Sequence, residues 1–156
     1  MNIKQYLPID EGVTHINIYS KSKLELGKLL SNFAKTPFTH PVYGEFASVE
    51  AFWYWLSTGK KHDSLKKLYG YKAKVEGKTF ERVTIDNFKE ELIFVLQCKL
   101  DQNPFIGKLL SESTLPIVHY YYYGTIEEPR VVVPTMNEWI TEWWETKRKE
   151  LQNVVN

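Results

Sequence analysis

The hydrophobic pattern of this chain is clearest in one short stretch, where aromatic residues recur at helical spacing. Residues 47–61 read ASVEAFWYWLSTGKK. Helical spacing separates two faces, one with Phe52, Trp55, Leu56 and Gly59, and the other with Glu50, Trp53, Tyr54 and Ser57. Both faces carry ring surface, so the pattern predicts a helix that is buried nearly all round. Ser48 suits its N-cap and Gly59 suits its exit.

Glu50 is the one carboxylate of this predicted helix, and the sequence is compatible with two roles for it. In the first, Glu50 lies at the edge of an aromatic-walled space, where burial raises its pKa and suits it to acid or base catalysis. In the second, it complements the positive end of the helix dipole, a role worth roughly 0.3 to 1 kcal/mol.

Other stretches have the two-residue period of strands. Residues 14–20 alternate apolar and polar positions, and residues 36–46 contain two short apolar pieces around Pro41 and Gly44, which indicates an irregular hairpin. Residues 115–123 read LPIVHYYYY and predict a further strand, and residues 130–133 are a second short candidate. We expect the segments 14–20, 36–46 and 115–123 to share a small mixed sheet.

Helical periodicity and capping residues predict several further helices. The segment 21–30 is helical or loop-like, the segment 63–69 is a short helix with a possible cap at Asp63, and the segment 71–76 is a single helical turn. The longest clear helix is predicted over residues 84–101. Two more helices are predicted, over residues 104–112 after Asn103-Pro104 and over residues 135–153, which begin with a Thr135/Glu138 capping box. Helices and short strands are thus mixed along the chain, which predicts an α+β fold. The length of 156 residues fits a single domain over 1–156, with residues 1–13 as an N-terminal arm.

Composition and charge narrow the possible partners. The net charge of +1 gives the whole molecule no strong attraction to nucleic acid or to an anionic membrane. A local excess of lysine does occur between Lys60 and Lys78, and such a segment could meet phosphate groups. Cys98 is the only cysteine, and no run is long and apolar enough for a membrane helix. We therefore expect a soluble, cytoplasmic protein with no membrane partner.

Several familiar catalytic patterns are missing from the sequence. The four histidines lack metal-ligand spacing, so we expect neither a metal nor another cofactor. His119 lies in an apolar stretch and is expected to be a hydrogen-bonded core residue. Gly77-Lys78-Thr79 lacks the earlier glycine of a phosphate-binding loop, and Cys98 is mid-helix, where it packs as a small residue. The tyrosines of Tyr120–Tyr123 could stack nucleobases but are also ordinary strand residues.

Three separated pieces of the first half together resemble the NADAR (YbiA-like) family. The pieces are Ile16-Asn17-Ile18-Tyr19-Ser20, Leu30-Ser31-Asn32-Phe33 with Pro37 after it, and Ser48-Val49-Glu50 at the start of the aromatic helix. In the second half, Tyr122-Tyr123-Gly124 resembles the family's Y-W-G, and Asn137 resembles the start of its N-x-L-G. The layout is also similar to a small family of T4-like phage proteins, which implies a phage origin and the host cytoplasm.

The resemblance implies an N-glycosidase, because family members hydrolyse N-glycosidic bonds in a ribosylamino-pyrimidine phosphate or in ADP-ribosyl groups on nucleobases. It implies Glu50 as the catalytic residue. The implied substrate-binding residues are Asn32, Phe33, Trp53, Tyr54, Tyr123, Glu127 and Asn137. The implied partners are a nucleotide or ADP-ribose-like small molecule and, by extension, ADP-ribosylated nucleic acid.

The sequence also departs from the family pattern at charged and glycine positions. The family's lysine further along the helix falls at Ser57, its acid before Y-W-G falls at or near Tyr120, and its glycine-rich stretch falls at residues 131–137. Glu127 could replace the lost acid. These departures motivate two alternatives, a non-catalytic protein that binds ADP-ribose-type nucleotides in phage-host conflict, and a protein-interaction module.

Overall fold

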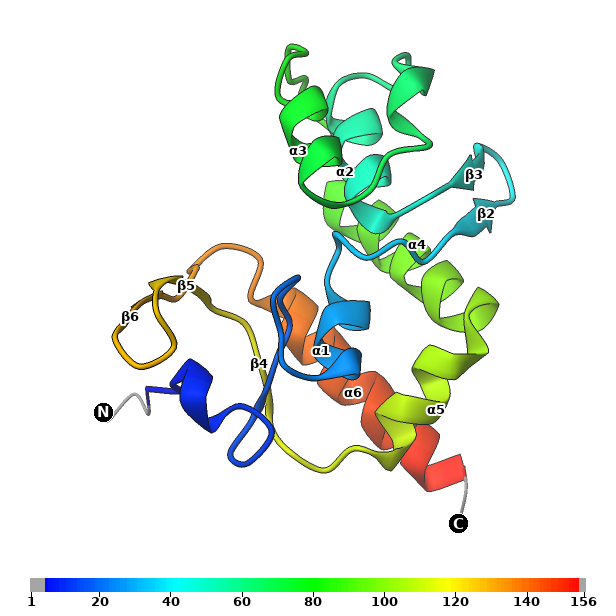
Figure 1. Cartoon of the computed structure of the whole chain (residues 1–156). Helices are drawn as coiled ribbons and strands as arrows, with labels where there is room; N and C mark the ends of the chain where they lie inside the picture. The colour runs from blue at the N-terminus through cyan, green and yellow to red at the C-terminus, as the bar shows by residue number, and fades with distance from the viewer. Residues whose placement is uncertain (1–4, 155–156) are drawn as a thin grey trace. The chain divides into compact units, whose positions relative to one another are not determined.

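The structure is a computed structural model that describes residues 5–154. The chain divides into two compact units, which we call the terminal unit (residues 1–31 and 108–156) and the central unit (residues 32–107) (Figure 1). The prediction of a single domain over residues 1–156 stays a prediction. Residues 1–4 of the predicted N-terminal arm lie outside the described residues, and Pro8–Asp10 form a short 3-10 helix, η1.

The central unit is built around α2 (Val49–Ser57), the predicted aromatic helix (Figure 1). Ser48 caps it as predicted, because its Oγ accepts a hydrogen bond from the Ala51 backbone N–H at 3.0 Å. Gly59 follows the helix with a φ of +103°, a conformation that favours glycine. Trp55 is buried and Trp53 half-buried, so this helix is enclosed as its sequence predicts.

An aromatic cluster joins α2 to the hairpin that precedes it. Strands β2 (Phe38–His40) and β3 (Gly44–Phe46) pair antiparallel, with Phe38 opposite Phe46. The ring of Phe46 lies 5.7 Å from that of Phe38 and 5.1 Å from that of Phe52, centroid to centroid. These three rings are almost completely buried, so the predicted hairpin is confirmed and forms one wall of the central core.

The sequence patterns predicted where the helices after the β2–β3 hairpin lie better than they predicted the residues at which these helices begin and end. The elements are η2 (Asp63–Leu65), α3 (Gly70–Gly77), α4 (Phe88–Gln102) and α5 (Pro104–Glu112), whose residues 108–112 belong to the terminal unit. Helix α5 has its predicted bounds, whereas α4 starts four residues later than expected. The predicted helix 63–69 is wrong beyond one 3-10 turn, since Asp63 caps nothing and its carboxylate instead accepts a hydrogen bond from Trp55 Nε1 at 2.9 Å.

In the terminal unit, a short parallel pair forms between distant parts of the chain. Strand β1 (Ile16–Asn17) pairs with β4 (Ile117–Val118). Just beyond it, the buried Asn17 side chain donates to the Tyr120 carbonyl at 3.0 Å and accepts from the Tyr120 N–H at 2.9 Å. The amide therefore takes the hydrogen bonds that a neighbouring strand would otherwise make at Tyr120.

This arrangement corrects the prediction of one shared sheet. Residues 115–123 form two strands instead of one, since the chain leaves β4 and starts β5 (Tyr121–Gly124), which pairs antiparallel with β6 (Pro129–Val132). Within the described residues the strands form separate two-stranded sheets, β1-β4, β2-β3 and β5-β6. The α+β class itself is confirmed, with helices supplying most of the regular structure.

Two helices complete the terminal unit, α1 (Glu25–Leu30) and α6 (Trp139–Val154). The predicted capping box at Thr135 and Glu138 is wrong, because the helix begins after Glu138 and Asn137 before it has a φ of +65°. Backbone N–H groups of Ile140 and Thr141 donate to the carbonyls of Asn137 and Glu138. The first turn of α6 is therefore closed by backbone groups.

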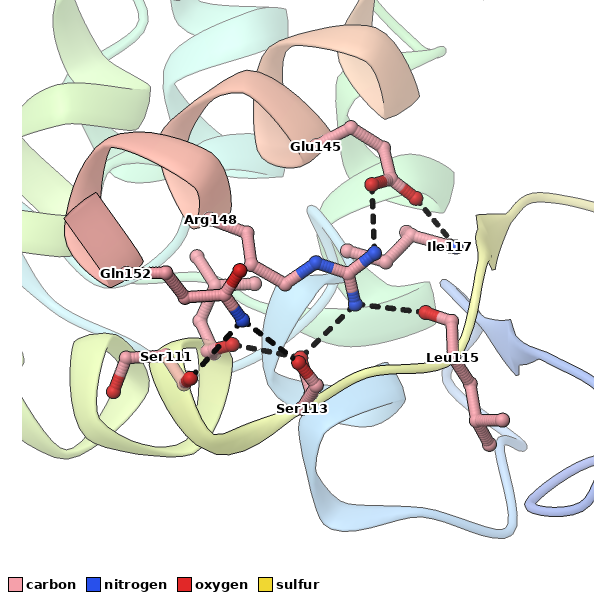
Figure 2. Close-up of polar contacts among 8 residues, drawn as sticks. Ser111, Ser113, Leu115, Ile117, Glu145, Arg148 and Gln152 are labelled. Atoms are coloured by element: carbon pink, nitrogen blue, oxygen red, sulfur yellow. Dashed lines mark hydrogen bonds and ion pairs between the residues drawn. The ribbon is translucent and has the colours of Figure 1, made fainter.

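A buried arginine ties α6 to the segment that leads into β4 (Figure 2). Arg148 donates from Nη1 to the Leu115 carbonyl at 2.7 Å and to Ser113 Oγ at 3.1 Å, and from Nη2 to Glu145 Oε2 at 2.7 Å. Glu145 Oε1 in turn accepts from the Ile117 backbone N–H at 2.7 Å. The Arg148–Glu145 pair therefore provides hydrogen-bond partners for the Leu115 carbonyl and the Ile117 N–H, two backbone groups at or just before the start of β4.

Within residues 5–154, no helix is long and apolar enough to cross a membrane. Over the same residues, no group of three or more His, Cys, Asp or Glu side chains is placed to hold a metal ion.

Candidate functional site

Glu50 lies in the first turn of α2, and its surroundings make it an unusual acid. Its backbone N–H donates to the Asn32 carbonyl at 2.9 Å, so the predicted Asn32 and Glu50 are neighbours. Burial raises the pKa of the Glu50 carboxyl from 4.5 to about 7, although the positive charges of Lys74, Lys78 and Arg82 act in the opposite direction. The carboxyl can therefore gain or lose a proton near neutral pH.

The cations around Glu50 come from α3 and the loop after it. Tyr54, one turn after Glu50 on the same face of α2, is buried, and Gly77 of α3 packs directly on its ring. The guanidinium of Arg82 lies over the same ring, 5.6 Å from its centroid. The Val83 N–H donates to the Ser57 carbonyl at 2.8 Å, which holds the Arg82 loop against the C-terminal end of α2.

Two buried polar atoms near this face have no hydrogen-bond partner. They are Asn32 Oδ1 and Ser57 Oγ. Leaving such a group unpaired costs about 1 to 3 kcal/mol, so each atom is suited to a bond with a bound molecule. Ser57 shares the helical face of Glu50 and Tyr54 and is only 7% exposed. The site thus combines a proton-exchanging carboxyl, positive charge and two unused polar atoms.

The other predicted residues of the central unit contribute mainly to packing around this site. Phe33 is half-buried, and its carbonyl accepts a hydrogen bond from the Gly70 N–H at 2.8 Å, which connects it to the start of α3. Trp53 is half-buried and meets the Phe88 ring of α4 edge-on, at 4.8 Å between centroids. Their roles in binding stay predictions.

The remaining predicted residues, Tyr123, Glu127 and Asn137, belong to the terminal unit. Tyr123 is 53% exposed on β5, and the guanidinium of Arg130 lies 4.8 Å from its ring centroid. Glu127 is exposed in the turn between β5 and β6. Asn137 lines a cavity of about 590 Å³ that lies within the terminal unit.

The aliphatic part of the cavity wall comes from β4, β6 and the segment after β6, and polar residues that include Glu138 and Glu142 complete the wall. The wall residues include Ile117, Val131, Val133 and Met136. His119 also lines it, and its Nδ1 lies 2.6 Å from the Ile18 carbonyl, which identifies Nδ1 as the protonated nitrogen because a carbonyl only accepts. Burial lowers the pKa of His119, so the ring is neutral, and its hydrogen bond agrees with the sequence prediction, although the ring is half-buried in a cavity wall and not in the core.

Replacing Gly77 with alanine tests the packing that brings α3 to Glu50. An added Cβ would overlap the Tyr54 ring, and we expect a loss of roughly 1 to 3 kcal/mol in the free energy of unfolding. Gly107→Ala is the matched control, because a Cβ there meets only Leu100 at 3.7 Å. That variant should be neutral or more stable by about 0.5 to 1 kcal/mol. Urea denaturation measures both, and equal effects would contradict close α2–α3 packing.

Sequence patterns included Lys74 and Lys78 in a segment that could meet phosphate, but they did not place these lysines near Glu50, and they did not select Arg82. The excess of lysine between Lys60 and Lys78 was visible, but Arg82 lies just outside it. The signal that could have selected these residues is Gly77, a helical glycine that permits close approach to another helix.

The described elements define a small α+β protein whose aromatic helix begins with a carboxylate of raised pKa. The structure is similar to the solved structure of the E. coli protein YbiA, with a TM-score of 0.64 and 16% sequence identity, over 91% of this chain and 87% of that chain. No protein-family model matches the sequence, and no curated protein matches it. The resemblance to the NADAR (YbiA-like) family is therefore confirmed in the fold. The relation to phage proteins stays a prediction.

Proposed function

We propose that the protein is a NADAR-like N-glycosidase that acts on an ADP-ribosyl or ribosylamino-phosphate substrate. The observation that carries the proposal is the Glu50 carboxyl, with a pKa raised to about 7 and three cationic side chains around it. Such a carboxyl can take and return a proton near neutral pH, while the cations favour an anionic substrate. The YbiA-like fold supports the same class of protein.

In this proposal Glu50 removes a proton from water as the water oxygen bonds to the anomeric carbon. The bond between that carbon and the base nitrogen breaks, and its electron pair leaves with the base. Protonated Glu50 then gives its proton to the leaving nitrogen, which restores the carboxylate. Asn32 Oδ1, which lacks a partner, accepts a hydrogen bond from a ribose hydroxyl and so fixes the sugar.

Turnover tests this proposal directly. We expect the wild-type protein to release ADP-ribose from ADP-ribosylated guanine nucleotides or ribose phosphate from the ribosylamino-pyrimidine phosphate, as detected by mass spectrometry. ADP-ribosylated DNA extends the assay to a nucleic-acid substrate. Asn32→Ala should lower kcat/KM by about tenfold, since one hydrogen bond is worth about 1 to 1.5 kcal/mol. If wild type and Glu50→Gln are equally inert with all three substrates, the enzyme proposal fails.

A second candidate is a protein that binds an ADP-ribose-type nucleotide without cleaving it. The observation that favours it is Ser57, which occupies the position of the family's lysine and whose buried hydroxyl is unpaired. A pocket that loses a catalytic group can keep its affinity for the ligand. A ligand at one hundred times its Kd stabilises the folded state by about 2.7 kcal/mol, so thermal shift detects binding. Binding with the ligand recovered intact identifies this second function.

A further inference from the structure

The C-terminal end of α2 holds two side chains, those of Arg82 and Ser57, to which the proton transfers proposed for Glu50 give no role. Arg82 lies over the Tyr54 ring. Ser57 follows Tyr54 by about one turn on the same helical face, and it is buried. Helix geometry separates Ser57 from Glu50 by roughly 10 Å along the axis, since each residue rises about 1.5 Å. The two ends of this face can therefore contact different parts of one bound molecule.

The backbone fixes the position of Arg82 at this end. The Val83 N–H donates to the carbonyl of Ser57 at 2.8 Å, so the residue after Arg82 is attached to the residue whose hydroxyl is unpaired. Tyr54 below the guanidinium is itself held in place, because it is 4% exposed and Gly77 packs on its ring. A guanidinium that stacks on a fixed ring keeps its N–H groups free at its edge, where they can donate in pairs to a phosphate.

The unpaired hydroxyl points to a ligand at the same place. Ser57 is only 7% exposed, and its Oγ makes no hydrogen bond within the described residues. A serine hydroxyl in a helix can donate to the carbonyl four residues earlier, and here it does not. Ser57 follows Tyr54 by one helical turn, and the Arg82 guanidinium lies over the Tyr54 ring, so an O–H donor and a cation share this end of the helical face and together suit an anion.

We propose that Arg82 and the Ser57 hydroxyl bind the phosphate of the substrate and so decide which N-glycosides the Glu50 site accepts. This proposal rests on the proposed function for its kinetic consequences, but the subsite can be tested without any turnover. The chemistry it requires is a phosphate or diphosphate group, separated from the reacting carbon by about two helical turns. Arg82 and Ser57 are thus specificity residues, whereas Glu50 acts on the reacting atoms.

The binding test uses inorganic pyrophosphate as the probe, with affinity measured by calorimetry at low salt. We expect Arg82→Ala to weaken pyrophosphate binding about tenfold or more and Ser57→Ala to weaken it several-fold. Arg82→Lys should be intermediate, because a lysine keeps the charge and loses the paired N–H donors. The matched control is Lys72→Ala, which removes one exposed positive charge from α3 but not from the surroundings of Glu50.

The kinetic test compares one N-glycoside with and without its phosphate. Arg82→Ala should raise KM about tenfold or more for the phosphorylated substrate, leave its kcat within a few-fold, and leave the dephosphorylated substrate unchanged. If no substrate turns over, the proposed function fails while the pyrophosphate result still decides the subsite. Failure of the wild-type protein to bind pyrophosphate, or equal losses in Arg82→Ala and Lys72→Ala, would overturn the proposal.

Discussion

Replacing Glu50 with glutamine is expected to abolish turnover while making the folded protein more stable at high pH. The amide keeps the shape of the side chain but cannot accept a proton from water. Because general acid-base catalysis contributes about 10² to 10⁴-fold, kcat/KM should fall by at least about one hundredfold. Steady-state kinetics with the substrates named above measures this effect, and retention of full activity would exclude Glu50 as the catalytic base.

The stability effect follows from the pKa of Glu50, raised from 4.5 to about 7 by burial. The folded state binds the proton more tightly than the unfolded state does. The stabilisation is therefore fully present below pH 4.5 and is lost as pH rises through 7. Over this window the wild-type free energy of unfolding should fall by roughly 1 to 3 kcal/mol on account of this group.

Glu50→Gln should lack this loss, so its stability relative to wild type should increase between pH 4.5 and pH 8. The measurement is urea denaturation of both proteins at several pH values. Glu45→Gln, a change at an exposed glutamate of β3, is the control and should follow the wild-type curve. A Glu50→Gln protein that is less stable by roughly 0.3 to 1 kcal/mol, with binding and activity intact, would instead show a helix-dipole role.

Replacing Arg148 with alanine is expected to be among the most destabilising single changes in the terminal unit. The change leaves the Leu115 carbonyl and Ser113 Oγ without their donor, and it leaves the Glu145 carboxylate without its cation (Figure 2). Leaving the buried carbonyl and hydroxyl unpaired costs about 1 to 3 kcal/mol, and the Glu145 carboxylate, whose side chain is 30% exposed, adds a smaller cost when it loses its cation. Arg148 is 7% exposed, so water cannot readily replace the lost donors.

Denaturation of Arg148→Ala beside Lys149→Ala measures this effect. Lys149 is the next residue of α6 and is exposed, and its loss should change the free energy of unfolding by no more than about 0.5 kcal/mol. Arg148→Lys should recover part of the stability, since a lysine keeps the charge but cannot make the forked contacts of a guanidinium. A loss below about 1 kcal/mol in Arg148→Ala would show that the network adds little.

Local sequence determined the elements that depend on neighbouring residues. The Ser48 cap, the exit at Gly59 and the bounds of α5 were all predictable, because a cap, a left-handed glycine and a proline at a helix start act within one turn of the chain. The aromatic faces of α2 also supported one of the two interpretations of Glu50, a buried carboxyl with a raised pKa, but they did not decide between it and a helix-dipole role.

The tertiary structure alone decided the partners of each segment. Residues 115–123 have strand composition throughout, yet the Asn17 amide binds both backbone groups of Tyr120 and separates β4 from β5. The cations around Glu50 likewise depend on Gly77 allowing α3 to pack on Tyr54. Side-chain periodicity indicates which face of a segment is buried, but it carries no information on which distant segment covers that face, and this pairing is set by packing and hydrogen bonds across the fold.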